Sequence, residues 1–288
     1  MQHFIYLLIV IFSLSLFGCG KGEISNSPDL NEVKKYISKT QDHRAVFTYE
    51  QYEELLRLLD DTNFIVLPIH EFIDSINDDK IMFGLRHDID CHPFRALEMA
   101  KMEHKHNFRA TYFVLATADY YGKLTKNGMN RFQCMDNVYR ELHSYGSEIG
   151  IHNDLLVSMI EYGLDPLEFN RVELNYFDSL GIDIYGCVAH GSDLAGKTVP
   201  NFEIFSDFAK TDSIEYQGKK YRIGEYSMKE YGYEYESNFL NNTKEFSDGG
   251  GKFYVGGFDE VIKQIKQHKA GARILLLAHP VWWGKKAE

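Results

Sequence analysis

Hydrophobic residues follow two alternating patterns along most of the chain. Short, nearly continuous apolar runs are typical of strands buried on both faces, and they occur at residues 80–88, 109–116, 147–152, 183–190 and 273–279. Between them, apolar residues recur at helical spacing, which predicts helices at residues 47–59, 93–106, 135–146, 165–181 and 258–271. Strands that alternate with helices predict an α/β fold, a mainly parallel sheet with helices packed outside it.

Local signals mark where several of these helices begin and end. Thr48 and Gln51 have the spacing of a capping box, and Pro93 suits the first position of a helix. Glycines that follow the helical pattern predict helix ends at Gly146, Gly181 and Gly271. Residues 197–256 are less regular and rich in Tyr, Gly, Asn and Asp, so we interpret them as excursions from the same domain.

The N-terminal segment is predicted to be a targeting sequence. Residues 4–17 are apolar but too short to span a bilayer comfortably, and they lead into Leu16-Phe17-Gly18-Cys19, which resembles the lipobox of bacterial lipoproteins. The resemblance implies a signal peptide at 1–18, a lipidated tether at 19–32 and a folded domain at 33–288. An uncleaved anchor or an ordinary cleaved signal stays open, because no Lys or Arg precedes the apolar run. The lipobox predicts an exported lipoprotein, tethered by Cys19 to a membrane of the cell envelope.

Composition narrows the classes of partner. The net charge of −11 and the absence of a Lys/Arg run argue against a nucleic-acid partner. The 19 Tyr and 20 Phe fit either stacking against sugars or simply a large core. The cysteines downstream of Cys19 lack metal-binding spacing, so we interpret them as mostly buried thiols: Cys91, Cys134 and Cys187.

Polar side chains gather where the predicted strands end. The ends of four separate strands carry His87, Asp88 and Asp90, then His152, His190 and His279. A single such histidine is usually a core residue, but in parallel α/β folds the carboxyl ends of the strands form the ligand-binding edge. Imidazole and carboxylate groups together suit a divalent ion, zinc first, with cobalt, nickel or manganese as alternatives. The pattern therefore predicts a metal site at this edge.

Four ordered blocks resemble the polysaccharide deacetylase (NodB-homology) superfamily, in its divergent branch with an RHDxD start and an HPxWW end. The blocks are Arg86–Asp90, Glu148–His152, His190–Ser192 and Leu277–Trp283. The resemblance implies a distorted (β/α) barrel of about seven mainly parallel strands. It also implies a metal-dependent hydrolase that removes N- or O-acyl groups from an acylated polysaccharide or other glycan.

The resemblance also implies roles for individual residues. Asp88 corresponds to the catalytic base, Asp90 and His152 to metal ligands, and His279 to the general acid. Arg86 is placed to orient the base carboxylate through a bidentate contact. The spacing of these residues by itself supports a site and does not assign their duties.

The chain departs from the family pattern at the third ligand. Leu156 stands where the family has a second histidine four residues after the first. His190, on a different strand, is our candidate to replace it. Asn153 either supports a neighbouring metal ligand or, as we prefer, forms part of a helix cap with Asp154.

Two further positions stay open. Asp248 lies where the divergent branch often has an Asp-containing loop, and it is either a site residue or part of a flexible turn. Trp282, with Trp283, either walls a sugar site or plugs the edge of the barrel.

Three functions are compatible with these residues. A base and an acid beside a metal favour a deacylase, since a protein that only binds needs neither. The leucine at the usual ligand position instead favours an inactive barrel lipoprotein that binds carbohydrate. A deformylase or amidase acting on another C–N bond would differ only in its substrate pocket.

Overall fold

The computed structural model describes residues 27–41 and 45–285. The predicted signal peptide, Cys19 and the first part of the tether lie outside the described residues. Within the described ranges, no helix is both long and apolar enough to cross a membrane.

Helices and strands alternate along the chain. The α-helices are α1 (Leu30–Gln41), α2 (Tyr49–Leu59), α3 (Ile69–Asp74), α4 (Pro93–Lys105), α5 (Asp136–Ser144), α6 (Leu155–Ile160), α7 (Pro166–Ser179), α8 (Asp193–Lys197) and α9 (Phe258–Gln267). Short 3-10 turns are η2 (Gln133–Met135), η3 (Asn201–Ile204), η4 (Ser237–Phe239) and η5 (Pro280–Trp282). The strands of the main sheet are β2 (Phe64–Leu67), β3 (Ile81–Ile89), β4 (Thr111–Leu115), β7 (Glu148–Asn153), β8 (Ile184–Ala189), β11 (Tyr235–Glu236), β12 (Lys244–Ser247) and β13 (Arg273–Ala278). The remaining strands pair outside it: β1 (Phe47–Thr48) with β14 (Trp283–Gly284), β5 (Gly122–Thr125) with β6 (Gly128–Arg131), and β9 (Ser213–Tyr216) with β10 (Lys219–Arg222).

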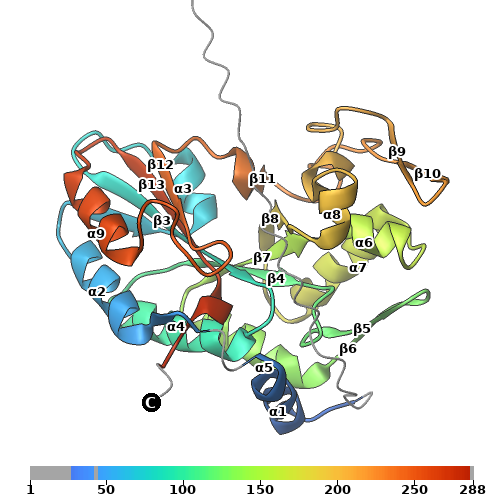
Figure 1. Ribbon diagram of the computed structural model, residues 1–288, viewed down its shortest axis with the longest axis horizontal. Helices are drawn as coiled ribbons and strands as arrows, with labels where there is room; N and C mark the ends of the chain where they lie inside the picture. Colours follow the sequence, from blue (N-terminus) through green and yellow to red (C-terminus); the bar gives the residue numbers. More distant parts are fainter. Residues whose placement is uncertain (1–26, 42–44, 286–288) are drawn as a thin grey trace, which may run out of the picture.

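The main sheet is a curled, parallel half-barrel, so the predicted distorted (β/α) barrel is confirmed. Its strand order is β11-β8-β7-β4-β3-β13-β12, and β2 also pairs with β3. All the pairs in this sheet are parallel. The strands curl through the centre of the molecule, with helices such as α2, α4, α7 and α9 around the outside (Figure 1). The carboxyl ends of neighbouring strands therefore lie along one edge.

Side chains on the two faces of the sheet form two clusters. The large cluster, which includes Phe83 and Leu276, packs the convex face against the helices. The small cluster, which includes Phe113, Val188 and Tyr235, fills the concave face. Gly186 leaves room for this cluster, because a Cβ there would lie 2.1–2.4 Å from the Tyr235 ring.

Most of the predicted boundaries are confirmed. Thr48 and Gln51 form a capping box at α2, and Pro93 is the first residue of α4. Gly146 and Gly181 adopt the left-handed backbone conformation after α5 and α7.

One predicted helix end was wrong. Helix α9 ends at Gln267 because His268 is already extended, and Gly271 turns the chain just before β13 instead. Helix α1 begins at Leu30, inside the predicted tether. Its start is fixed by reciprocal hydrogen bonds of 2.9 Å between Asp29 and Glu32, in which each backbone N–H donates to the other's carboxylate.

The irregular segment 197–256 contributes more than excursions. It supplies β11 and β12, which form the two edges of the main sheet, together with the β9–β10 hairpin that projects from the fold (Figure 1). Both edge strands are too short to give a recognisable hydrophobic run. The prediction of buried thiols holds for Cys187, whereas Cys91 and Cys134 are only half-buried.

Candidate metal centre

The carboxyl edge of the sheet carries a row of polar side chains in strand order. From β8 to β12 the row runs His190, His152, Asp88 with Asp90, His279 and Asp248, interrupted only by Leu115 at the end of β4. Residues that are distant along the chain meet here because their strands are neighbours in a parallel sheet. The edge predicted from the positions of the histidines is the edge where these side chains converge.

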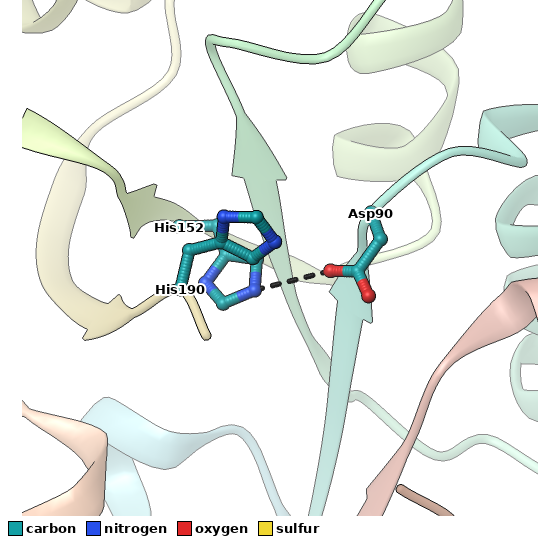
Figure 2. Close-up of side chains that lie close together, drawn as sticks. All are labelled: Asp90, His152 and His190. Atoms are coloured by element: carbon teal, nitrogen blue, oxygen red, sulfur yellow. Dashed lines mark ion pairs between the residues drawn. The ribbon is translucent and has the colours of Figure 1, made fainter. Parts of the chain in front are cut away.

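Asp90, His152 and His190 form a cluster that could hold a metal ion. One ligand atom from each residue lies within 4.8 Å of the others. Figure 2 shows the two imidazole rings facing the Asp90 carboxylate, with Asp90 Oδ1 3.2 Å from His152 Nε2. Two imidazoles and one carboxylate form a donor set suited to a divalent transition ion, with positions left open for other ligands.

The tautomer of His152 strengthens the fit to a cation. Its Nδ1 lies 3.0 Å from the carbonyl oxygen of Val188, which can only accept, so Nδ1 carries the proton. In the neutral ring, Nε2 then presents a lone pair to Asp90 Oδ1, which is buried and accepts no hydrogen bond from the described residues. Two lone pairs 3.2 Å apart repel each other unless a proton or a metal ion lies between them. The Val188 carbonyl is the kind of outer contact that orients a metal-bound histidine.

Asp154 orients His190 from the other side. Its Oδ2 lies 3.3 Å from His190 Nδ1, which leaves Nε2 as the ring nitrogen for a metal. Thr117 and Asn201 donate hydrogen bonds to the same carboxylate, at 2.8 and 3.0 Å. Burial lowers the pKa of His190, but the charges of Asp154 and Asp90 outweigh that effect and raise it to about 8. Asp154 is therefore a partner of His190, and it makes no side-chain bond as a helix cap.

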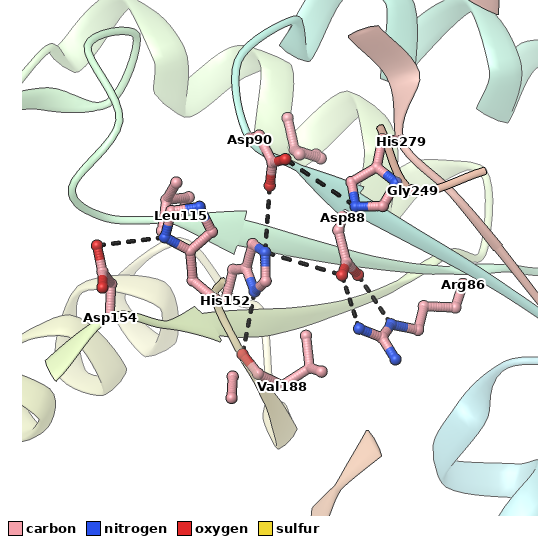
Figure 3. A network of polar contacts seen from close by, with 12 residues as sticks. Arg86, Asp88, Asp90, Leu115, His152, Asp154, Val188, Gly249 and His279 are labelled. Atoms are coloured by element: carbon pink, nitrogen blue, oxygen red, sulfur yellow. Dashed lines mark hydrogen bonds and ion pairs between the residues drawn. The ribbon is translucent and has the colours of Figure 1, made fainter. Parts of the chain in front are cut away.

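Arg86 holds Asp88 in a fixed orientation beside the cluster. The guanidinium donates two hydrogen bonds, from Nε to Oδ1 at 2.9 Å and from Nη2 to Oδ2 at 2.7 Å (Figure 3). Asp88 Oδ2 lies 3.7 Å from His152 Nε2. Burial raises the pKa of Asp88, but the charge and hydrogen bonds of Arg86 oppose that effect, and the pKa lies below its ordinary value. Asp88 is thus a buried, ionised carboxylate whose lone pairs are aimed by a bidentate contact.

Asp248 holds His279 on the side of Asp90 that lies away from His152 and His190. Its buried carboxylate lies 2.6 Å from His279 Nδ1, accepts from the His279 backbone N–H, and accepts from Trp283 Nε1 at 2.7 Å. The His279 Nε2 atom then points to Asp90, with Oδ2 4.0 Å away (Figure 3). Burial lowers the pKa of His279, but the charge and hydrogen bond of Asp248 raise it to about 9. Asp248 is therefore part of an ordered dyad and not of a flexible turn.

His87, which also ends a predicted strand, points away from this edge. Side chains alternate along β3, so Arg86 and Asp88 face the concave side and His87 faces the helices. His87 is fully buried there, where its Nε2 lies 2.7 Å from Glu103 and its ring stacks on Tyr112. It is a core histidine.

Four other positions singled out in the sequence are explained by their surroundings. Asn153 is buried, and its side chain bonds the backbone of Leu155 and Asn201, so it braces the start of α6 and is not a substrate group. Leu156 is fully buried in the core, which leaves no ligand at that position. The two tryptophans have different surroundings. Trp283 is buried against Asp248, and Trp282 lines a groove beside the cluster.

Sequence reasoning missed two residues that brace the centre. Glu236 is buried at the end of β11 and accepts from the Ala189 N–H at 2.7 Å, immediately before His190. Asn201, from the irregular segment, donates to Asp154 and to the His190 carbonyl. The signal for Glu236 was a charged residue at the end of a strand, but that strand is only two residues long.

The comparisons with known proteins add no relative. No family model matches the chain, and neither a curated protein nor a solved structure matches it. The interpretation of the centre therefore depends on its own geometry and on the sequence blocks.

Proposed function

We propose that this protein is a metal-dependent hydrolase that removes acyl groups, acetyl in particular, from a glycan or a sugar-derived substrate. The observation that carries the proposal is the arrangement around Asp90. A cluster able to hold a metal ion lies between an arginine-held aspartate and an aspartate-held histidine. A site with two differently tuned ionisable groups beside a cation fits hydrolysis better than simple binding.

Asp90, His152 and His190 would hold the ion, with zinc as the first choice because of the two imidazole ligands. A bound divalent ion would polarise the acyl carbonyl and make water a stronger nucleophile near neutral pH. His190 takes the place of the family's second histidine, so the leucine at residue 156 does not remove the third ligand.

Asp88 is the proposed base. A base must be ionised before it can accept a proton, and the lowered pKa of Asp88 meets that condition. The two hydrogen bonds from Arg86 fix the direction of its lone pairs, which limits the entropy lost in reaching the reactive geometry.

His279 is the proposed acid. The leaving amine or alcohol must receive a proton as the carbon–heteroatom bond breaks. With its pKa raised to about 9, His279 carries that proton at neutral pH. Asp248 occupies Nδ1, so Nε2 is the atom that donates. This division between an ionised carboxylate and a charged imidazole is the one that acyl hydrolysis requires.

The test combines metal analysis with acyl release. The purified protein should contain one divalent ion, and it should release acetate from an acetylated sugar oligomer or a chromogenic ester. Chelation should abolish release, and added zinc should restore it. His279→Ala and Asp88→Asn should each lower turnover about 10²–10⁴-fold while the metal content stays the same.

Four results would contradict the assignment. Loss of metal in His279→Ala would make that residue a ligand, and full activity would make it structural. Release of no acyl group by the metal-loaded protein would reject the hydrolase and leave a carbohydrate-binding barrel. Release from a non-sugar amide such as a formamide, but from no sugar, would keep the chemistry and change the substrate.

A further inference from the structure

A pocket lies between the β9–β10 hairpin and the turn that joins α6 to α7. This hairpin pocket has a volume of about 490 Å³, which is within the usual range for sites that bind small molecules. Residues 163–167 and 220–226 form most of its walls, and the buried Ile204 and Tyr231 lie at its inner side. In Figure 1 the hairpin extends past α6 and α7, on the side of the fold away from α2 and α9.

The hairpin pocket is separate from the metal centre. It shares no lining residue with the groove beside the metal cluster. Val157 and Tyr162 line that groove, whereas Met159 and Leu164 line the hairpin pocket, so α6 and the turn after it lie between the two. A ligand in the hairpin pocket would therefore touch none of the proposed catalytic residues.

Tyr231 brings a hydroxyl without a partner to the inner end of the hairpin pocket. The residue is only 3% exposed. Its backbone carbonyl accepts a hydrogen bond from Asn170, but its hydroxyl forms none in the part of the chain that the structure describes. Burial first, and then the charges of Asp165 and Glu225, raise the pKa of that hydroxyl. Both carboxylates line the hairpin pocket, so the hydroxyl lies on the pocket side of the residue.

A buried hydroxyl of this kind calls for a ligand. Buried polar groups in folded proteins are nearly always hydrogen-bonded, because an unpartnered group gives up its bonds to water and gains none in return. The neighbouring Tyr233 follows that rule, since its hydroxyl donates to Asn170. Among the described residues nothing satisfies the hydroxyl of Tyr231, so only a molecule that enters the hairpin pocket can do so. That molecule must carry a polar group able to donate to or accept from a phenol.

An open aromatic ring lies next to this hydroxyl. Tyr226 lines the hairpin pocket and is 40% exposed, so part of its ring is free to contact a ligand. Its ring meets that of Tyr231 edge to face, with 6.5 Å between the centroids. Tyr221, which is half-buried, adds a second aromatic side chain to the wall. The ligand should therefore have a flat apolar face beside its polar groups.

The charges around the hairpin pocket balance. Two exposed cations and two exposed anions line it, namely Lys220, Arg222, Asp165 and Glu225. Arg222 and Glu225 already form an ion pair, with 3.0 Å between Nη1 and Oε1. Such a lining has no net charge and favours neither an anion nor a cation, so it fits a neutral ligand.

From these features we propose that the hairpin pocket is a second binding site, which takes a neutral sugar unit of a glycan chain. A pyranose ring has an apolar face of C–H groups that packs on the ring of Tyr226. The hydroxyls at its edge donate and accept, so one of them pairs with the hydroxyl of Tyr231. The site holds a chain near the metal centre and takes no part in hydrolysis. It goes beyond the proposed function and does not require it.

Titration of the full-length protein with four neutral tetrasaccharides tests the inference. They are built from glucose, galactose, mannose or N-acetylglucosamine, and the NMR signals of ring-labelled tyrosines report which pocket is filled. At least one of them should shift the signals of Tyr221, Tyr226 and Tyr231 to saturation. The affinity should change less than about twofold between about 20 mM and 300 mM salt, because a neutral ligand has no charge to screen. Chelation of metal should leave this binding unchanged.

Two variants locate the ligand, and each has a matched control. Tyr231→Phe removes only the unpartnered hydroxyl, so the affinity should fall about three- to tenfold while the thermal midpoint does not fall. Tyr233→Phe removes a hydroxyl that is bonded within the core, so it should lower the thermal midpoint and keep the affinity. Tyr226→Ala should weaken binding about tenfold, because the stacking ring is lost. Tyr254→Ala removes a ring that is 66% exposed elsewhere on the surface and should keep the affinity.

Three results would overturn the inference. They are the absence of a shift in the signals of Tyr221, Tyr226 and Tyr231 with all four sugars, unchanged affinity in Tyr231→Phe or Tyr226→Ala, and a shift confined to Tyr162 in the groove. Failure of the proposed function would appear separately, as absence of acyl release by a protein whose hairpin pocket still binds sugar.

Discussion

At the scale of single residues, the centre depends on which ring nitrogen of each histidine is not already occupied by a hydrogen-bond partner. The Nδ1 atom of His152 contacts a backbone carbonyl, and the Nδ1 atom of His279 contacts the Asp248 carboxylate. Both rings therefore turn Nε2 toward Asp90. The two rings nevertheless differ, because a carbonyl has no charge and a carboxylate does. That difference suits His152 to ligating a metal ion and His279 to donating a proton.

The two histidine ligands should matter equally for the metal. His190→Ala and His152→Ala should each lower metal content at least tenfold, since each removes one of three donor atoms. Elemental analysis after dialysis against buffered zinc measures the loss. His104→Ala, an exposed histidine on α4, should keep full metal content. If His190→Ala also keeps it, Asp88 is the better third ligand.

Asp248 should act on the reaction through His279. Asp248→Asn removes the charge that raises the His279 pKa, and one amide cannot satisfy every donor that now points at the carboxylate. We expect kcat to fall about 10²-fold with little change in KM or metal content. The limb of the pH profile that reports His279 should move to lower pH, because its pKa falls. A lower kcat with an unmoved limb would point to a purely structural role.

At the scale of elements, the parallel strands position the polar residues of the site. Glycines within the strands shape the concave face of the sheet. Strand β3 shows how: one side of the alternation delivers Arg86 and Asp88 to the site, and the other delivers His87 to the core. A one-residue shift in its register would exchange the two sets.

Gly186 should be intolerant of a side chain. Gly186→Ala places a methyl group 2.1–2.4 Å from the ring of Tyr235, which cannot swing aside easily because it is buried and donates to Glu148. Such overpacking costs about 1–3 kcal/mol, measured as a change in the free energy of unfolding by chemical denaturation. Gly191→Ala has no atom within 4 Å of its new methyl group and serves as the control. Equal stability of the two variants would mean that the concave face can relax.

At the scale of the whole molecule, the open question is where the domain resides. We propose that Cys19 is lipidated and that the following residues tether an exported domain, because several acyl chains give the stable attachment that one does not. Cys19→Ser should move the protein out of the membrane fraction or block its processing. Fractionation and mass spectrometry of the mature N-terminus would show this. Unchanged processing and location would reject the lipobox interpretation.

The sequence alone determined the fold class and the location of the site. Apolar runs and helical spacing depend on neighbouring residues, so β3, β7, β8 and β13 could be predicted, and the polar residues at their ends with them. The short strands β2, β11 and β12 could not, because each is at most four residues long and is stabilised by its neighbours in the sheet.

Only the tertiary structure decided which polar residues act together. Asp248 and His279 are 31 positions apart in the sequence, and Asp154 and His190 are 36 positions apart. Neither pairing follows from spacing, because both depend on which strands lie side by side. The same holds for His87, whose sequence neighbours suggested the site and whose strand face placed it in the core. Local pattern sets which residues can reach the edge, and the sheet order and pleat decide which of them meet.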